Sequence, residues 1–312
     1  MSDTVLTLWL ITDNKPGHRS QLQGLAQALA ARTTIDAHWI DAPSGPRVVL
    51  DVLLGRFPAG AALPAPDFLL VAGHRTHLAG LAARRARGGR LIALMRPSLP
   101  LSWFDLCVIP QHDNPPHRAN VLVTRGVLNT ACPSAEREAD KGVFLIGGPS
   151  KHYGWDTTGL MAQIDAIVSA TPGMRWTLTT SRRTPAATEA ALLALRERGV
   201  DVRPVRDTPP GWAMDQVAHS AQAWVTEDSV SMVYESLTAG AATGLLAVPR
   251  LGETRIAAGV TTLQDQGWVT PFEVWRRDGV MHTAPQRLCE ADRVADVLLS
   301  NENTRCAPQP QG

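Results

Sequence analysis

The stretch Ala223-Trp-Val-Thr-Glu-Asp-Ser-Val-Ser-Met-Val-Tyr-Glu-Ser-Leu-Thr-Ala-Gly240 decides the fold that we predict for this chain. It begins as a short apolar strand, passes through a polar turn and continues as a helix that ends at Gly240. At about 100° per residue, Ser231 and Glu235 lie on the polar side of this helix. The opposite, apolar stripe consists of Val230, Val233, Leu237 and Ala241. A buried strand followed at once by a one-sided helix is the repeating unit of α/β proteins.

The start of this helix suits the phosphate of a bound nucleotide. A helix N-terminus presents free N–H groups and a partial positive charge, and Asp228, Ser229 and Ser231 stand at that position. Glu235 follows nearly two turns later, where its carboxylate can accept hydrogen bonds from ribose hydroxyls. The alternative is that Asp228 and Ser229 only cap a core helix. The segment alone leaves both interpretations open.

Two adjacent arginines follow another apolar strand, residues 175–180. Ser181, Arg182 and Arg183 stand where the next helix opens, and Pro185 suits the first turn of that helix. The helix dipole disfavours cations at this end. A bound anion reverses the preference, because a guanidinium group can donate two hydrogen bonds to one phosphate. The pair therefore favours an anion site.

A third loop of the same half is rich in glycine. The apolar strand 142–147 runs into Gly147 and Gly148, and glycine allows the backbone to approach a ligand closely. Each of the three loops alone is a weak indication. Together, three strand-end loops with phosphate-compatible chemistry favour a nucleotide site in this half of the chain.

The alternation of apolar strands and amphipathic helices runs through the whole chain. Because such strands form parallel sheets covered on both faces, we predict an α/β protein of two Rossmann-like domains that face a cleft. The domains span residues 1–135 and 140–285, a helix at 286–300 crosses back onto the first domain, and 301–312 form a frayed tail. Ligands in such folds bind beyond the carboxyl ends of the strands, where the three loops lie.

The element boundaries follow from the same periodicity. The predicted strands are 4–11, 35–40, 67–72, 90–95, 104–109, 120–124, 142–147, 175–180, 222–226 and 244–248. Besides the crossing helix, the predicted helices are 19–32, 75–87, 156–170, 185–198, 229–240 and 253–266. Residues 131–141 are predicted to be a linker or a short irregular connection.

Composition limits the class of protein. The 312 residues, 44% of them hydrophobic and 19% charged, describe an ordinary globular protein with room for two domains. A net charge of +1 gives no global attraction to nucleic acid or anionic membranes. The arginines of the run 84–87 stand at a predicted helix C-terminus, where the dipole favours cations. Four scattered cysteines and an N-terminal apolar run too short to cross a membrane predict a cytoplasmic protein.

Two loops of the first half carry groups suited to general base catalysis. Gly17 and His18 follow the first strand, where the imidazole can face the cleft; the alternative is a solvent-exposed histidine at a helix start. His112 and Asp113 follow the strand at 104–109, although neighbouring residues in a loop often point apart. The sequence contains no P-loop, nucleophile-elbow or HExxH motif. The pair His74 and His77 lacks an obvious third ligand, so we expect neither a metal nor a cofactor.

Five motifs together resemble those of a known family. They are Thr12-Asp-Asn-Lys-Pro-Gly-His18, Phe104-Asp105 with Pro110-Gln-His-Asp113, Leu145-Ile-Gly-Gly-Pro149, Thr179-Thr-Ser-Arg-Arg-Thr-Pro185 and Thr226-Glu-Asp-Ser-Val-Ser-Met232. In this order they resemble the elongated-mitochondria (ELM-type) fission family. Its plant members recruit a dynamin-like protein to mitochondria, and its bacterial members often carry a nucleoside-diphosphate-sugar epimerase label.

The spacing from Asp228 to Glu235 is also similar to the nucleotide-sugar signature of GT-B glycosyltransferases and UDP-GlcNAc 2-epimerases. Those enzymes have glycines where this chain has Val230 and Ser231, which changes the diphosphate pocket. The resemblance implies a GT-B-like glycosyltransferase that takes a nucleotide-sugar donor and an acceptor. Epimerisation of the sugar, or a non-catalytic scaffold that binds a protein partner, are the alternatives.

The predicted site divides into two groups. His18 and Asp113 are the candidate catalytic bases. The candidate substrate-binding residues are Gly17, His112, Gly147, Gly148, Ser181, Arg182, Arg183, Asp228, Ser229, Ser231 and Glu235.

Overall fold

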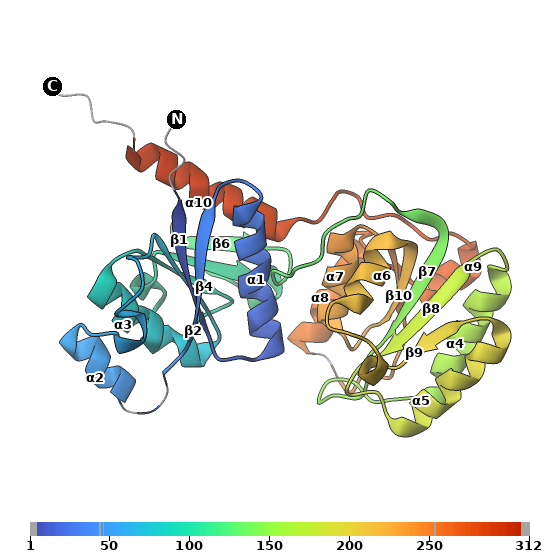
Figure 1. Cartoon of the computed structure of the whole chain (residues 1–312). Coiled ribbons are helices and arrows are strands. Elements are labelled where there is room, and N and C mark those ends of the chain that lie inside the picture. The colour runs from blue at the N-terminus through green and yellow to red at the C-terminus, as the bar shows by residue number, and fades with distance from the viewer. Residues whose placement is uncertain (1–4, 44, 46, 253, 307–312) are drawn as a thin grey trace. The chain divides into compact units, whose positions relative to one another are not determined.

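The computed structural model describes residues 5–43, 45, 47–252 and 254–306, and the chain divides into two units. The first unit consists of the residues up to Thr130 and those from Cys289 onward, and the second of Ala131–Leu288. Each contains one six-stranded sheet with helices around it (Figure 1). The predicted α/β class with two Rossmann-like domains is therefore confirmed. The shared cleft stays a prediction, and residues 307–312 of the predicted tail lie outside the described residues.

The sheet of the first unit is parallel and has the order β2-β1-β3-β4-β5-β6. Its strands are β1 (Leu6–Thr12), β2 (Ile35–Asp41), β3 (Phe68–Ala72), β4 (Arg90–Leu94), β5 (Leu106–Pro110) and β6 (Val121–Thr124). The chain runs from β1 to β2 in one direction and then adds β3 on the other side of β1. This reversal makes the carboxyl ends of β1 and β3 the point at which such sheets bind ligands.

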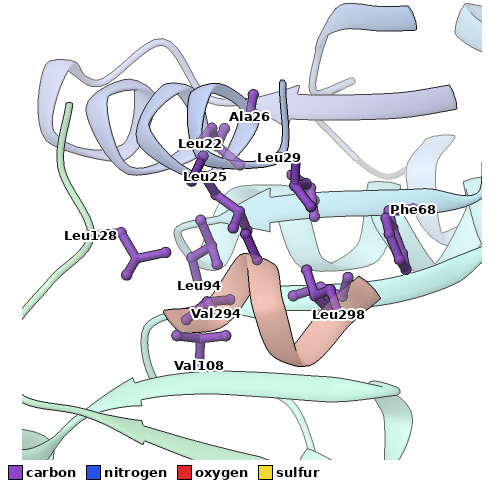
Figure 2. Packing of buried hydrophobic residues seen from close by; sticks show 14 of the residues in the cluster. Leu22, Leu25, Ala26, Leu29, Phe68, Leu94, Val108, Leu128, Val294 and Leu298 are labelled. Atoms are coloured by element: carbon purple, nitrogen blue, oxygen red, sulfur yellow. The ribbon is translucent and has the colours of Figure 1, made fainter. Parts of the chain in front are cut away.

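Helices cover both faces of this sheet. One face carries α1 (Pro16–Ala30) and α10 (Glu290–Cys306), and the other carries α2 (Arg47–Leu54) and α3 (His77–Arg87). Leu22, Leu25 and Leu29 of α1 share one buried cluster with Val294 and Leu298 of α10 (Figure 2). The end of the chain thus completes the core of the first unit.

The sheet of the second unit is also parallel, with the order β12-β11-β10-β7-β8-β9. Its strands are β7 (Glu138–Ile146), β8 (Arg175–Thr180), β9 (Asp201–Arg203), β10 (Ser220–Thr226), β11 (Ala242–Leu246) and β12 (Thr270–Pro271). Here the direction reverses between β7 and β10. The carboxyl ends of β7 and β10 are therefore the expected ligand-binding point of this sheet.

Two sets of helices enclose the second sheet. One buried cluster joins it to α6 (Trp212–His219), α7 (Val230–Ala239) and α8 (Arg255–Asp265). The other joins it to α4 (Thr157–Ala170), α5 (Ala186–Leu193) and α9 (Phe272–Asp278). No helix among the described residues is long and apolar enough to cross a lipid bilayer.

The structure adds elements that the periodicity did not predict, namely α2, α6, α9, β9 and β12. The segment predicted as a linker contains the first residues of β7, from Glu138. Polar residues form strand there because β10 pairs with them, with Ser220 opposite Glu138. Arg175 of β8 also binds the carboxylates of Glu138 and Asp140. Helix α10 continues to Cys306, so the first residues of the predicted tail are helical.

Candidate functional site

The three predicted phosphate-compatible loops of the second unit lie at the ends of adjacent strands. Gly147 follows β7, Ser181 follows β8 and Glu227 follows β10, and these strands are neighbours in the order β10-β7-β8. Hydrogen bonds join the loops directly: the N–H of Gly147 donates to Thr226 Oγ1 at 2.8 Å. The loops therefore form one cluster at the switch point of the sheet.

Asp228 is the centre of this cluster. Its side chain is fully buried, and its Oδ2 accepts hydrogen bonds from the N–H of Gly148 at 3.0 Å and from Arg183 Nη2 at 2.8 Å. Arg183 also donates to the carbonyl oxygen of Gly148. The other carboxylate oxygen, Oδ1, is buried without a hydrogen-bond partner among the described residues. Asp228 therefore holds two loops together and does not cap a helix.

The glycines of the 147–148 turn serve the packing of the chain on itself. A Cβ on Gly147 would lie 2.3 Å from Asp228 Oδ2, and one on Gly148 would lie 2.1 Å from the carbonyl oxygen of Arg183. Thr184 completes the contact by donating to the carbonyl oxygen of Gly147 at 2.6 Å. The N–H groups of Gly147 and Gly148 already have partners within the chain, so these contacts do not depend on a ligand. The close approach of the two glycines to a ligand remains a prediction.

We expect Gly148→Ala to lower the free energy of unfolding by about 1–3 kcal/mol, because the new methyl group overlaps a backbone oxygen that cannot move independently. Urea denaturation measures the loss. Gly173→Ala is the matched control, since a Cβ there meets no atom within 4 Å. Equal stability of the two variants would contradict the contact between the loops.

The N-terminus of α7 lacks a side-chain cap. Ser229 is the N-cap residue, yet its side chain makes no capping hydrogen bond. The N–H groups of Val230, Ser231 and Met232 have no hydrogen-bond partner among the described residues. The capping interpretation of Asp228 and Ser229 is therefore wrong, and the helix start keeps the free donors that bind anions.

Arg182 and Arg183 have different environments. Arg183 is paired with the buried Asp228 carboxylate, so its charge is already balanced within the protein. Arg182 is exposed and makes no ion pair or hydrogen bond with any residue in the described part of the chain. Of the two arginines, Arg182 is the cation left for an external anion.

Glu235 lies half-buried on the polar side of α7, at the fourth position after the exposed Ser231. It makes no hydrogen bond or ion pair within the described residues. Burial raises the pKa of its carboxyl group to about 7, since no nearby cation balances the charge. A carboxyl group with no structural partner and a strongly raised pKa is typical of a functional site.

A buried ion pair formed by Glu227 and Arg250 was not predicted from the sequence. Glu227 is buried, and its Oε2 accepts hydrogen bonds from Arg250 Nε at 3.0 Å and Nη2 at 2.5 Å. The N–H of Val248 donates to Oε1 at 3.3 Å. This pair joins the end of β10 to the segment after β11. Nothing in the sequence links residues so far apart.

In the first unit, His18 is oriented by Asp13. The Nδ1 of His18 lies 2.8 Å from Asp13 Oδ1, and the Asp13 side chain is only 3% exposed. Burial tends to raise the pKa of Asp13, but the hydrogen bonds from His18 and the Lys15 N–H outweigh it and lower the pKa. His18 Nε2 has no hydrogen-bond partner among the described residues, so it remains available to a substrate. His18 was predicted from the sequence, whereas its partner Asp13 was not.

Gly73, at the end of β3, fixes where the imidazole lies. A Cβ on this residue would lie 2.3 Å from the Cε1 atom of His18, and its φ of +91° also favours glycine. The ring therefore packs directly on the backbone at the end of β3. This places Asp13 and His18 at the β1/β3 switch point of the first sheet.

His112 and Asp113 belong to a short 3-10 helix at the end of β5. Because β3 and β4 separate β1 from β5 in the sheet, the two strand ends lie about 14 Å apart at about 4.8 Å per strand. The structure brings His18 together with Asp13 and not with Asp113. A role for His112 or Asp113 in catalysis stays a prediction.

A pocket of about 370 Å³ lies beside Asp13. Its polar lining comes from Thr12, Asp13, Asn14, Asp41, His74 and Arg75. The Oδ2 atom of Asp13 is buried and has no hydrogen-bond partner among the described residues. The pocket can therefore accept a polar molecule beside Asp13, although His18 itself is not among its lining residues.

His74 and His77 lie in different environments, and no third ligand accompanies them among the described residues. His77 is buried, its Nδ1 lies 3.2 Å from Ser98 Oγ, and burial together with the charges of His74 and His18 lowers its pKa to about 4. Within the described ranges, no group of three or more His, Cys, Asp or Glu side chains is arranged to hold a metal ion.

Comparisons with known proteins identify relatives of this chain. The model of a family described as Mitochondrial fission ELM1 matches residues 16–301. A curated relative, the uncharacterized protein RP120 of Rickettsia prowazekii (strain Madrid E), is 27% identical over 122 residues, which cover 35% of this chain and 32% of that protein. The match therefore spans about a third of this relative's length.

Solved structures with the same fold share little sequence. A protein of Listeria monocytogenes described as a candidate UDP-N-acetylglucosamine 2-epimerase has a TM-score of 0.65 at 14% identity, covering 97% of both chains. The UDP-GlcNAc 2-epimerase of Methanocaldococcus jannaschii has a TM-score of 0.59 at 11% identity, covering 95% of this chain and 100% of its own. That of Neisseria meningitidis, bound to UDP-GlcNAc, has a TM-score of 0.58 at 10% identity, covering 96% and 100%. The fold of this chain is thus GT-B-like.

Proposed function

This chain belongs to the mitochondrial fission ELM1 family, and we propose that it works as a nucleotide-sugar-dependent glycosyltransferase of the GT-B type. One observation carries the proposal. At the switch point of the second sheet, the uncapped start of α7 belongs to the same cluster of loops as the exposed, unpaired cation Arg182, and the unpaired acid Glu235 follows on the same helix. These groups match the diphosphate and the ribose of a nucleotide.

The donor binds to the second unit in this proposal. The free N–H groups of Val230 and Ser231 and the guanidinium group of Arg182 bind the diphosphate. Glu235 accepts hydrogen bonds from the ribose hydroxyls, and Ser181 and Ser229 border the phosphates. Asp228 and Arg183 act indirectly, because they hold the loops of the cluster in place.

The proposed transfer of the sugar needs a base for the acceptor hydroxyl and positive charge near the departing diphosphate. His18 Nε2 takes the proton of an acceptor hydroxyl while that oxygen attacks the anomeric carbon of the donor sugar. The bond from this carbon to the diphosphate oxygen breaks, and the nucleoside diphosphate leaves. The helix N-terminus and Arg182 stabilise the negative charge of the departing group without a metal ion.

The first unit supplies the acceptor side. Asp13 holds His18 in the tautomer that keeps Nε2 free of hydrogen. The polar pocket lined by Asp13, Asp41 and Arg75 supports an acceptor that carries several hydroxyl or other polar groups. The same residues would position the sugar of an epimerase substrate, so epimerisation remains the enzymatic alternative. The epimerases of the same fold share too little sequence to decide between the two.

A scaffold that binds a protein partner is the non-enzymatic alternative. Such a protein would have no need of an unpaired, half-buried acid, which favours a ligand-binding role. We place the protein in the cytoplasm, which is supported by the free thiols of Cys107 and Cys132.

A panel of nucleotide sugars and nucleoside diphosphates tests the proposal through the rise in melting temperature of the purified protein. A selective rise with one nucleotide is expected, followed by release of that nucleoside diphosphate when acceptors are added. Conversion of the sugar without an acceptor would establish the epimerase. If no nucleotide raises the melting temperature, the non-enzymatic scaffold is the remaining alternative.

The two arginines give a sharper test. Arg182→Ala is expected to weaken nucleoside diphosphate binding by about 1–3 kcal/mol and to leave the unliganded protein as stable as before. Arg183→Ala is expected to lower the free energy of unfolding by about 1–3 kcal/mol, because it leaves the buried Asp228 carboxylate without its cation.

Calorimetric titration measures the first effect and denaturant unfolding the second. Each variant serves as the control for the other, because both remove one guanidinium group and the two positions are adjacent in the same loop. Wild-type nucleotide affinity in Arg182→Ala would remove this residue from the donor site.

A further inference from the structure

Helix α2 of the first unit exposes an unusual amount of apolar side chain. Val49, Leu50, Leu53 and Leu54 are 49%, 53%, 68% and 49% exposed. At about 100° per residue, the four side chains fall within an arc of about 140° on one face of the helix. The other side, with the buried Val48, packs into the core cluster that includes α3. We call the four exposed residues the α2 patch.

Three arginines surround the α2 patch. Arg47 begins the helix and Arg56 follows its end, while Arg85 of α3 passes beside Gly55, where an added Cβ would lie 3.6 Å from the Arg85 Nε. All three are exposed, and none makes an ion pair with a residue in the described part of the chain. Between Arg47 and Arg56 the single acidic residue is Asp51.

We propose that the α2 patch docks the protein on the surface of an anionic lipid bilayer. An aliphatic helix face bordered by cations is the pattern of a helix that lies in a membrane interface. Its apolar side chains enter the boundary between head groups and acyl chains, and Arg47, Arg56 and Arg85 attract the phosphates of anionic lipids. This attraction is local, because the chain as a whole has a net charge of only +1.

The composition of the patch favours a bilayer over a protein partner. Binding energy at protein interfaces is concentrated in Trp, Tyr and Arg, and Leu and Val are under-represented there. The α2 patch contains only Val and Leu, and its arginines lie at both ends of the helix and not at its centre. A fluid lipid surface needs no shape complementarity, which suits this arrangement.

Flotation with lipid vesicles tests the proposal on the full chain. We expect the protein to float with vesicles of phosphatidylcholine and phosphatidylglycerol in equal parts, and to bind phosphatidylcholine alone much less. Leu50→Ser with Leu53→Ser should lower the binding to anionic vesicles about tenfold or more. Changing Arg47, Arg56 and Arg85 to Gln should lower it about a hundredfold, at about fivefold for each arginine.

Matched controls separate the patch from general surface properties. Leu251→Ser, at a leucine 64% exposed in the second unit, and Arg118→Gln, at another exposed arginine, should bind as the parent does. Melting temperatures confirm that each variant folds. Wild-type protein that ignores anionic vesicles, or serine variants that still float, would overturn the proposal. The proposal would also be overturned if the α2 patch binds a second copy of this chain. In that case the parent protein would be a dimer and the serine variant a monomer.

Discussion

Glu235→Gln is expected to stabilise the unliganded protein above neutral pH and, at the same time, to weaken its binding of a nucleoside diphosphate. The reason is the raised pKa of this carboxyl group, about 7 against an ordinary 4.5. Below pH 4.5 the group is protonated in the folded and unfolded chain alike. Between the two pKa values the unfolded chain loses the proton first, so the free energy of unfolding falls as the pH rises.

Above pH 7 the folded protein bears the full cost of a half-buried charge. Since one pKa unit corresponds to about 1.4 kcal/mol, the ceiling of this cost is about 3 kcal/mol. Glutamine has similar size and helix propensity and carries no charge, so the variant avoids the cost. The variant and the parent should therefore be about equally stable near pH 4 and diverge near pH 8.

Nucleotide binding should change in the opposite direction. If Glu235 accepts hydrogen bonds from ribose hydroxyls, a neutral amide is a weaker acceptor, and the affinity for UDP or a similar diphosphate should fall by about 1–3 kcal/mol. The parent should also bind more tightly as the pH rises through 7, because the carboxylate form then dominates.

Melting curves and titrations from pH 4 to pH 8 check both signs in one preparation. Glu197→Gln, the same change at an exposed position on another element, is the control. A variant more stable than the parent that still binds nucleotide with parental affinity would show that Glu235 lies outside the ribose site.

Asp13→Asn is expected to lower the turnover of the proposed reaction by about 10²–10⁴-fold while leaving donor affinity unchanged. The asparagine amide can donate a hydrogen bond to His18 Nδ1, which places the ring hydrogen on Nε2. An imidazole in that tautomer cannot take the proton of the acceptor hydroxyl. Donor affinity should persist because the residues of the proposed nucleotide site belong to the other unit.

Turnover is measured as release of nucleoside diphosphate in the presence of the acceptor found by the ligand screen. His18→Gln should be at least as inactive, and adding Asp13→Asn to it should cost little more, because the two residues act as one unit. Asp113→Asn is the comparison, and turnover near that of the parent is expected. A loss of turnover in Asp113→Asn together with an active Asp13→Asn would make Asp113 the base and exclude the His18 mechanism.

The strands and loops that surround the candidate site could be predicted from the sequence, because each has a local pattern of apolar and polar residues. The apolar runs before Gly147, Ser181 and Glu227 predicted three strands with loops at one edge, and the structure makes these strands neighbours. The same patterns could not predict α2, since its most apolar residues face solvent and so depart from the amphipathic rule on which prediction depends.

The partners within the site depend on sheet order, which periodicity does not contain. The Gly148–Asp228 hydrogen bond joins residues 80 positions apart, and it exists because β10 lies next to β7. The carboxylate partner of Arg183 could not be predicted for this reason, since Asp228 comes next to Arg183 only when the strand order is known. Asp13, by contrast, lies five residues before His18, so that pair was within reach of the sequence.

The return of α10 to the first unit has a consequence for synthesis on the ribosome. Ala131–Leu288 is inserted between the two segments of the first unit, so the second unit leaves the exit tunnel complete before its predecessor does. Leu22, Leu25 and Leu29 emerge early, but the Val294 and Leu298 that cover them follow only after this whole insertion. At about 5–20 residues per second, the nascent first unit waits roughly 10–30 s with this stripe uncovered. The vectorial order of synthesis thus makes the N-terminal half of the chain the last part to complete its core.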